Sequence, residues 1–216
     1  MLCVNVGLAM TIGLERVRGR TGSIVHNAAA LLIAALTLIA ILSDLAFAGA
    51  PYIHSMPVGG AFFNLVLLGY GLPAVLAIIV ALIARMTRPI SYRVAATIAA
   101  VMLALFYLTL EVRRLFHGPI LAGPTSDAEQ YAYSTVWLAF GIVLLAVGFY
   151  LRSQPARLTA LAVIALTIAK VFIIDTASIS GIYRALSVIG LGVVLLGIGW
   201  VYQHVLYPRT RPEEGS

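Results

Sequence analysis

The chain has 216 residues, of which 62% are hydrophobic and only 10% charged, and its mean hydropathy is +1.03. This composition excludes a water-soluble globule, because 14 basic and 8 acidic side chains cannot give a folded body of this size a polar surface. The single cysteine, Cys3, excludes a disulfide framework and a cysteine-based zinc site. The four histidines have no metal-ligand spacing, so we expect neither a metal nor another cofactor.

Residues 1–24 combine a short apolar segment with a basic stretch. Residues 2–14 are apolar but too few to cross a bilayer, and the basic residues Arg16, Arg18 and Arg20 follow them. A signal peptide has the opposite order of charge. Two interpretations stay open: the segment is the cytoplasmic half of a severed transmembrane helix, or it is an interfacial helix on the inner leaflet.

Six apolar runs within residues 25–207 are long enough to cross a bilayer. A helix needs about 20 predominantly apolar residues to span a hydrocarbon core of ~30 Å. The runs lack the alternation that marks the ~10-residue strands of a membrane barrel. The sequence therefore predicts an all-α fold, a polytopic integral membrane bundle of six transmembrane helices. They are expected at 27–50, 61–84, 94–110, 131–151, 158–174 and 184–206. The remaining tail, 208–216, is expected to be a disordered cytoplasmic segment.

The distribution of charge predicts the orientation. With the N-terminus in the cytoplasm, the inner side holds ten arginines and three acids, and the outer side holds four basic and five acidic residues. The sides then sum to +7 and −1, which accounts for the whole net charge of +6. Because basic residues beside spans resist translocation, we expect both termini inside. No nucleic-acid partner is needed to explain the charge.

Glycines spaced seven residues apart predict close packing between helices. Such a spacing places both glycines on one stripe of a helix, where a neighbour can approach closely. The pairs are Gly141 with Gly148, Gly190 with Gly197, and Gly192 with Gly199. In the second span, Pro73 removes a backbone hydrogen bond near mid-membrane, so we expect a kink there.

Ionisable side chains collect at the predicted outer ends of the spans, and none lies at mid-membrane. This distribution argues against a proton relay or an ion path. The acidic candidates for a catalytic role are Glu111, Asp127, Glu129 and Asp175. The candidates for binding an anionic ligand are Arg113, Arg114, His117, Lys170, Tyr183 and Arg184.

Two interpretations of this charged cluster stay open. In the first, it is an interfacial network of salt bridges with a tyrosine belt and a snorkelling Lys170. In the second, Arg113, Arg114 and Arg184 bind the phosphate of an anionic headgroup, such as a lipid-linked diphosphate, and a nearby carboxylate acts as general base. Both require the ends of the third, fifth and sixth spans to meet in one patch.

Four segments resemble a bacterial family of predicted polytopic membrane proteins, domain of unknown function 2339. They are NLVLLGYGLPA from Asn64, EVRRLFHG from Glu111, EQYAYSTVW from Glu129, and residues 170–202, which begin KVFIIDTASISG. The resemblance covers about residues 60–207, and residues 1–60 resemble the family only in composition. The resemblance implies a much longer parent chain with more spans, and it carries no activity.

Three functional hypotheses from different classes follow. The first is a helical packing and assembly module of a larger envelope membrane protein or complex in the bacterial inner membrane. Its partners would be the lipid bilayer and other transmembrane helices or subunits. The second is an outer-leaflet transferase acting on a lipid-linked sugar or another anionic lipid. The third is a transporter, which ranks last because spans one to three show no inverted repeat of spans four to six.

Overall fold

The fold is built from helices. The computed structural model describes residues 2–46, 57–60 and 63–175, together with residues 189, 190, 192, 193, 196, 197, 199 and 200. Within these ranges every regular element is a helix, which confirms the all-α prediction. The chain divides into two compact units, Met1–Ile164 and Ala165–Ser216.

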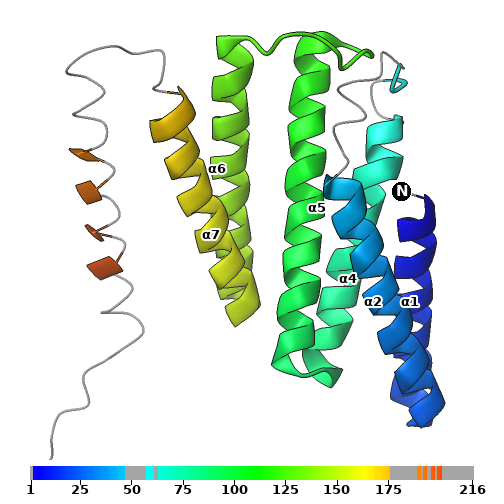
Figure 1. Ribbon diagram of the computed structural model, residues 1–216. Helices are drawn as coiled ribbons and strands as arrows, with labels where there is room; N and C mark the ends of the chain where they lie inside the picture. The colour runs from blue at the N-terminus through cyan, green and yellow to red at the C-terminus, as the bar shows by residue number, and fades with distance from the viewer. Residues whose placement is uncertain are drawn as a thin grey trace, which may run out of the picture. The chain divides into compact units, whose positions relative to one another are not determined.

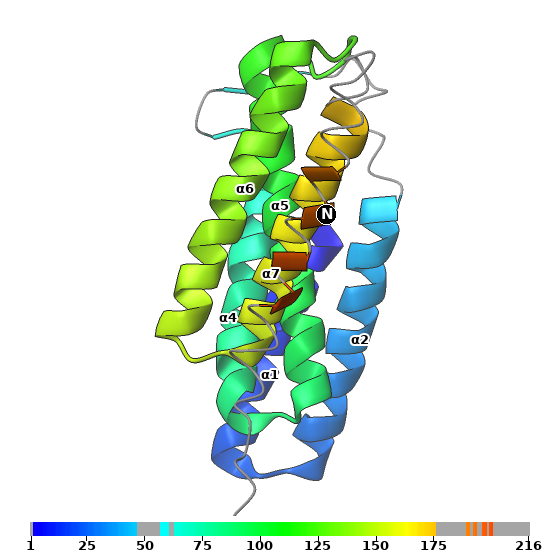
Figure 2. The same cartoon turned by 90° about the vertical axis from the view of Figure 1, so that its left-hand side faces the viewer.

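The helices of the first unit follow one another up and down. In Figures 1 and 2, α4 and α5 lie side by side, and α1 runs antiparallel to α2. The elements in chain order are α1 (Leu2–Thr21), α2 (Ile24–Ala46), the π-helical turn η1 (Leu67–Gly71), α4 (Leu72–Thr87), α5 (Ile90–His117), α6 (Asp127–Tyr150), α7 (Gln154–Lys170) and the π-helical turn η2 (Val171–Asp175). The α1–α2, α4–α5 and α6–α7 turns share one end, which we call the basic end, and the α5–α6 loop lies at the other, the loop end.

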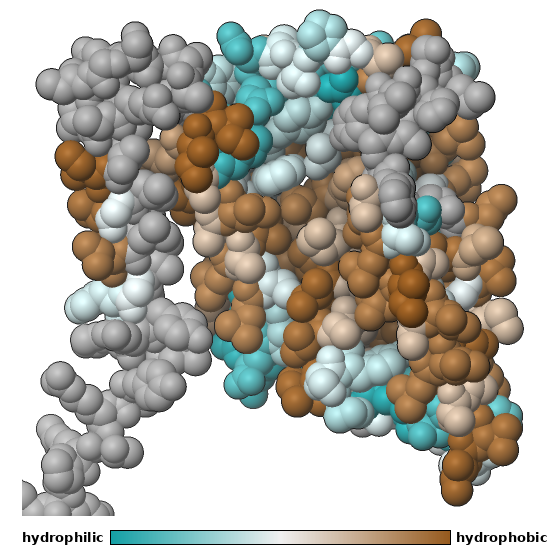
Figure 3. Space-filling view, viewed as in Figure 1, coloured by the Kyte–Doolittle hydropathy of each residue, from teal (hydrophilic) through white to brown (hydrophobic). Residues whose placement is uncertain are grey.

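Five segments of the described chain are long and apolar enough to cross a membrane. They are Ile24–Ala46, Leu67–Arg85, Ile90–His117, Asp127–Tyr150 and Gln154–Asp175. These segments correspond to the first five predicted spans. The sixth, 184–206, falls mostly outside the described residues, as does the tail 208–216, so the count of six stays a prediction. Figure 3 shows apolar side chains over the middle of the helices and polar ones toward the two ends.

Several helices extend beyond the apolar runs that predicted them because local signals set their ends. Arg88 is extended, as expected for a residue before proline, and Pro89 caps the start of α5. Gly118, with φ of 72°, ends α5 with its N–H bonded to the Arg114 carbonyl. The Ser126 hydroxyl caps α6 by accepting from the Glu129 N–H at 3.2 Å. The polar residues that flank the predicted apolar spans therefore form the first and last turns of α5 and the first turn of α6.

The N-terminal segment is a helix within the bundle. The sequence predicted a short apolar half-helix followed by a basic stretch, but α1 continues through that stretch to Thr21. One stripe of α1 is buried, comprising Val4, Leu8, Thr11 and Glu15, and α1 packs against both α2 and α4. Of the two interpretations, this packing favours a helix that lies among the others over one that rests on the leaflet surface.

A π-helical turn, Leu67–Gly71, directly precedes α4 and Pro73, where the sequence predicts a kink. The Leu72 N–H bonds to the Leu67 carbonyl, five residues back, and Pro73 then falls in the first turn of α4. Because η1 continues directly into α4 as one segment, Leu67–Arg85, Pro73 removes one helical hydrogen bond at this junction. At Gly71 a Cβ atom would lie 2.8 Å from Leu67 Cδ1 and 3.1 Å from Tyr107 Cε2, so the glycine allows α5 to approach.

Gly141 and Gly148 line the side of α6 that faces the first part of α7. A Cβ atom at Gly141 would lie 2.7 Å from Ile164 Cγ1, and one at Gly148 would lie 3.0 Å from the Arg157 backbone nitrogen. Both distances are shorter than a normal contact, so these positions leave no room for a side chain. Only scattered residues are described around Gly190, Gly192, Gly197 and Gly199, and packing there stays a prediction.

We predict that Gly148→Ala and Gly13→Ala change stability in opposite directions. A methyl group at Gly148 meets the backbone of α7, which cannot move cheaply, so the expected cost is about 1–3 kcal/mol. At Gly13 no described atom lies within 4 Å, and alanine should gain up to about 1 kcal/mol of helix propensity. The check is the thermal unfolding midpoint in detergent, and an equal effect of both changes would contradict the packing.

Candidate functional site

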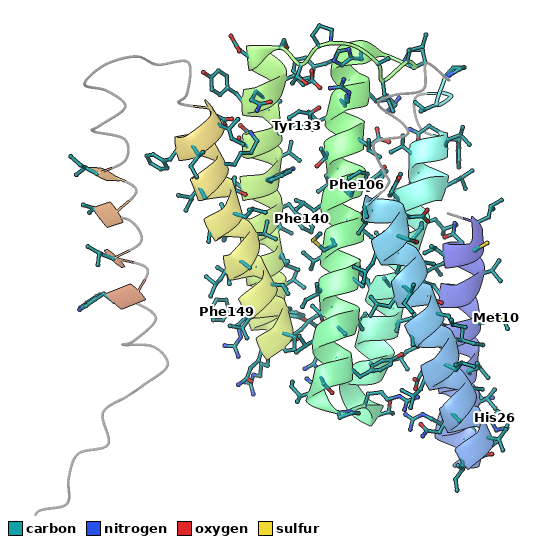
Figure 4. All side chains as sticks on the ribbon, viewed as in Figure 1. Met10, His26, Phe106, Tyr133, Phe140 and Phe149 are labelled. Atoms are coloured by element: carbon teal, nitrogen blue, oxygen red, sulfur yellow. The ribbon has the colours of Figure 1, made fainter. Side chains whose placement is uncertain are left out.

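A buried ionic network joins α5, α6 and the loop between them. We call it the loop-end network, comprising Arg113, His117, Glu129 and Tyr133. Gly118 ends α5 and Ser126 begins α6, so the short segment between them returns the chain toward α5. Figure 4 shows Tyr133 on the part of α6 near this loop. Two of the sequence candidates, Arg113 and Glu129, are the centre of this network.

Arg113 lies at the centre and is only 5% exposed. Its Nε donates to the Leu121 carbonyl at 2.6 Å, and its Nη2 donates to the Gly123 carbonyl at 2.7 Å. Its Nη1 donates to Thr125 Oγ1 and to Glu129 Oε1, both at 3.1 Å. The guanidinium therefore holds the loop against α5, and its donors point into the protein.

Glu129 is fully buried and receives hydrogen bonds on both oxygens. Oε1 accepts from Arg113 and from the Tyr133 hydroxyl, and Oε2 lies 2.9 Å from His117 Nε2. The imidazole of His117 packs against Gly123, whose φ of 129° suits glycine. A buried carboxylate is tolerated when it is paired and hydrogen-bonded in this way.

A second ion pair lies within the loop end of α5, and a hydrogen bond from Asn64 connects it to the chain before η1. Arg114 Nη2 lies 2.7 Å from Glu111 Oε2, and Asn64 Nδ2 donates to Glu111 Oε1 at 2.9 Å. Asn64 Oδ1 accepts from the Leu67 N–H at 2.6 Å. Both oxygens of Glu111 are thus occupied by groups of this chain, and Asn64 connects the carboxylate to the start of the π-helical turn.

The basic end has its own network, which the sequence analysis missed. We call it the basic-end network, comprising Glu15, Arg18, Asn27 and Arg88. Glu15 is 2% exposed and pairs with Arg88 Nη2 at 2.7 Å and with Arg18 Nε at 3.1 Å. Arg88 also donates to Asn27 Oδ1 at 2.6 Å. Residues of α1 and α2 therefore meet at Arg88 of the α4–α5 turn, which pairs with Glu15 and donates to Asn27.

A helical stripe would have revealed Glu15 in the sequence. Positions 4, 8, 11 and 15 recur at intervals of four, three and four, which is one face of a helix, and all four are buried. Glu15 is also the single acid within residues 1–43, beside Arg16, Arg18 and Arg20. The neighbouring arginines make residues 15–20 look like a solvated basic stretch. In the structure Glu15 is instead the buried partner of Arg18 in α1 and Arg88 in the α4–α5 turn.

Among the described residues, the contacts that define the two networks include none of the remaining candidates Asp127, Lys170 and Asp175. Asp127 and Tyr131 are exposed in the first turns of α6. Lys170 Nζ donates to Asp175 Oδ1 at 2.8 Å within the second unit, where the π-helical turn η2 brings residues five apart together. Tyr183 and Arg184 lie outside the described residues. The single patch expected from the third, fifth and sixth spans therefore stays a prediction.

The two networks mark the limits of an apolar layer. On α5 no charged residue lies between Arg93 and Glu111, 18 residues that rise about 27 Å at 1.5 Å per residue. That length is close to the ~30 Å hydrocarbon core of a bilayer. Across residues 2–46, 57–60 and 63–175, no group of three or more His, Cys, Asp or Glu is arranged to hold a metal ion.

Comparison with protein families matches residues 1–205 to the family described as "Predicted membrane protein (DUF2339)". The chain belongs to this family. The match supports the resemblance in the four quoted segments and extends it to residue 1, so residues 1–60 share more with the DUF2339 family than composition. Comparisons with curated proteins and with solved structures found no match. This DUF2339 chain is thus a membrane protein with several helices able to span a bilayer.

We predict that Arg113→Lys destabilises the protein more than Arg114→Lys. Lysine keeps the charge but cannot reach Leu121, Gly123 and Glu129 together, and a buried acceptor left unpaired costs about 1–3 kcal/mol. A loss of about 2 kcal/mol should lower the unfolding midpoint by roughly 4–8 °C. Arg114 is more exposed and is the matched control. Equal midpoints for the two variants would contradict a structural role for Arg113.

Proposed function

We propose that this chain is a non-catalytic helical module of a bacterial inner-membrane protein or complex, and that it packs against further transmembrane helices. One observation carries the proposal: both oxygens of Glu111 and both oxygens of Glu129 already accept hydrogen bonds from this chain. Carboxylates occupied on both oxygens in this way are ion-pair partners inside the bundle, whereas a general base needs an oxygen within reach of a substrate proton.

The basic members of the same networks support the same function. The Arg113 guanidinium donates to two carbonyls, a hydroxyl and a carboxylate, and Arg114 pairs with Glu111. Recognition of a phosphate needs a guanidinium that presents its paired donors to the ligand. In this chain those donors connect helices and loops, which is the expected arrangement for groups that hold a bundle together.

The helix surfaces support association within the membrane. Only 17% of the residues in the most apolar part of α2 are buried, so this helix presents an apolar side to lipid or to other helices. In the sixth predicted span, two glycine stripes on nearly opposite faces suit close approach of helices on both sides, as small residues do in membranes. We propose that this span is the main contact with the partner helices.

We predict that Gly190→Leu with Gly197→Leu reduces the size of the assembly. Two leucines on one stripe separate helices that would otherwise touch through their backbones. The measurement is the mass of the full chain, extracted in a mild detergent, by light scattering. The matched control is Ile189→Leu with Val193→Leu in the same span, which replaces side chains that are already bulky. Unchanged mass for the glycine variant, with wild type larger than a monomer, would contradict the proposed contact.

We propose that the basic end faces the cytoplasm, because arginines beside spans resist translocation. The test uses single cysteines in a Cys3→Ser background: Pro124→Cys in the α5–α6 loop and Gln154→Cys in the α6–α7 turn. Both residues are exposed. We expect a membrane-impermeant maleimide to label residue 124 in intact cells and residue 154 only after permeabilisation. The reverse labelling would invert the orientation, although the contacts of the two networks would remain the same.

A further inference from the structure

A groove at the basic end is the feature that the two networks do not use. It lies within the first unit, between α4, α5, α6 and the start of α7, and encloses about 130 Å³. Of its 16 lining residues, 12 are apolar, and the others are Arg85, Arg93, Thr97 and Ser153. The groove therefore combines an apolar body with two guanidinium groups.

The arginines lie at one end of the groove and the apolar residues extend from them. Arg85 is in the last turn of α4 and Arg93 is in the first turn of α5, next to the α4–α5 turn. Along α5 the lining continues to Ala104, 11 residues further, a rise of about 16 Å. Phe140 lines the deeper part and packs from α6 against α5, as Figure 4 shows.

The groove opens to the surroundings of the helices. Three of its lining residues are exposed large apolar side chains: Ile78, Leu82 and Val147, each more than 40% exposed. Because these residues belong to segments long and apolar enough to span a membrane, acyl chains would surround them in a bilayer. A lipid could therefore enter from the side without any helix having to move.

The charge around the groove is basic, with no acidic partner for Arg85 or Arg93 in the described part of the chain. Residues 72–110 and 130–164 contain five arginines and no acid. The acid that reaches this region, Glu15, is already shared by Arg18 and Arg88. An anion at this end would supply the missing negative charge at the boundary of the membrane.

We propose that this groove binds one anionic phospholipid of the leaflet at the basic end, with its phosphate on Arg85 and Arg93 and one acyl chain along α5 toward Ala104. Arginine suits this role because its planar donors match the phosphate oxygens. Basic pockets between membrane helices favour anionic headgroups, with about 1 kcal/mol for each basic residue. The apolar body selects a lipid over a soluble phosphate, because a free anion gains nothing from it.

The test is native mass spectrometry of the full chain in detergent, titrated with phosphatidylglycerol or with phosphatidylcholine of the same acyl chains. We expect one tightly retained phosphatidylglycerol per chain. Binding should be at least about tenfold weaker in the Arg85→Gln, Arg93→Gln variant, which removes two charges. The matched control is Arg16→Gln with Arg20→Gln, which removes two exposed arginines of the same end outside the groove and should leave binding unchanged.

A second variant tests the apolar body without changing the charge. Ala81→Phe places a ring in the groove and should weaken phosphatidylglycerol binding, while glycerol 3-phosphate should bind neither wild type nor variant measurably. Equal binding of the two lipids, or equal loss in both double-arginine variants, would overturn the proposal. A wild-type chain that retains no lipid but loses its oligomer on Ala81→Phe would also overturn it, because a helix of a second chain would then occupy the groove.

Discussion

Hydrocarbon cannot solvate an ion, and this constraint accounts for the positions of the charged side chains in the first unit. Charge is absent from about 27 Å of α5 between Arg93 and Glu111, and buried ion pairs lie at both ends of that interval. An ion at such a boundary is stable only when it is paired and hydrogen-bonded. The contacts of Glu15 and Glu129 meet this requirement, and they determine which helix ends are held together.

The two networks connect different kinds of element. At the loop end, Arg113 holds three carbonyl or hydroxyl groups of the segment that joins α5 to α6, so a loop takes its shape from one side chain. At the basic end, Glu15 forms ion pairs with Arg18 of its own helix and with Arg88 of the α4–α5 turn, so it attaches α1 to the bundle. The groove beside Arg85 differs from both, because its charge has no counterpart in the described chain.

Composition and apolar run length predicted the helices, because a membrane imposes a length and an apolar surface that are visible in any sequence. The same reasoning placed the start of α6 at residue 131, although the capping serine at 126 marks it earlier. Five candidate residues share the loop end: Glu111, Arg113, Arg114, His117 and Glu129. The partners that Glu129 takes from α5 could not be predicted from spacing along the chain. Glu111 and Arg114 are three residues apart and share a helix face, so their ion pair follows from the sequence. The ion pairs Arg113–Glu129 and Glu15–Arg88 join different elements, so they depend on tertiary packing.

The π-helical turn Leu67–Gly71 has a consequence for the rotational phase of the second span. Each residue of an α-helix rotates the side-chain direction by about 100° around the helix axis. A π-turn contains one more residue than an α-turn, so it changes that direction for everything before it. Asn64 lies just before this turn, so its direction relative to the side on which Ala74, Ala77 and Val80 are buried depends on the extra residue of the turn. Deleting one residue of the turn would restore regular winding and move Asn64 away from Glu111, while the buried stripe below kept its register.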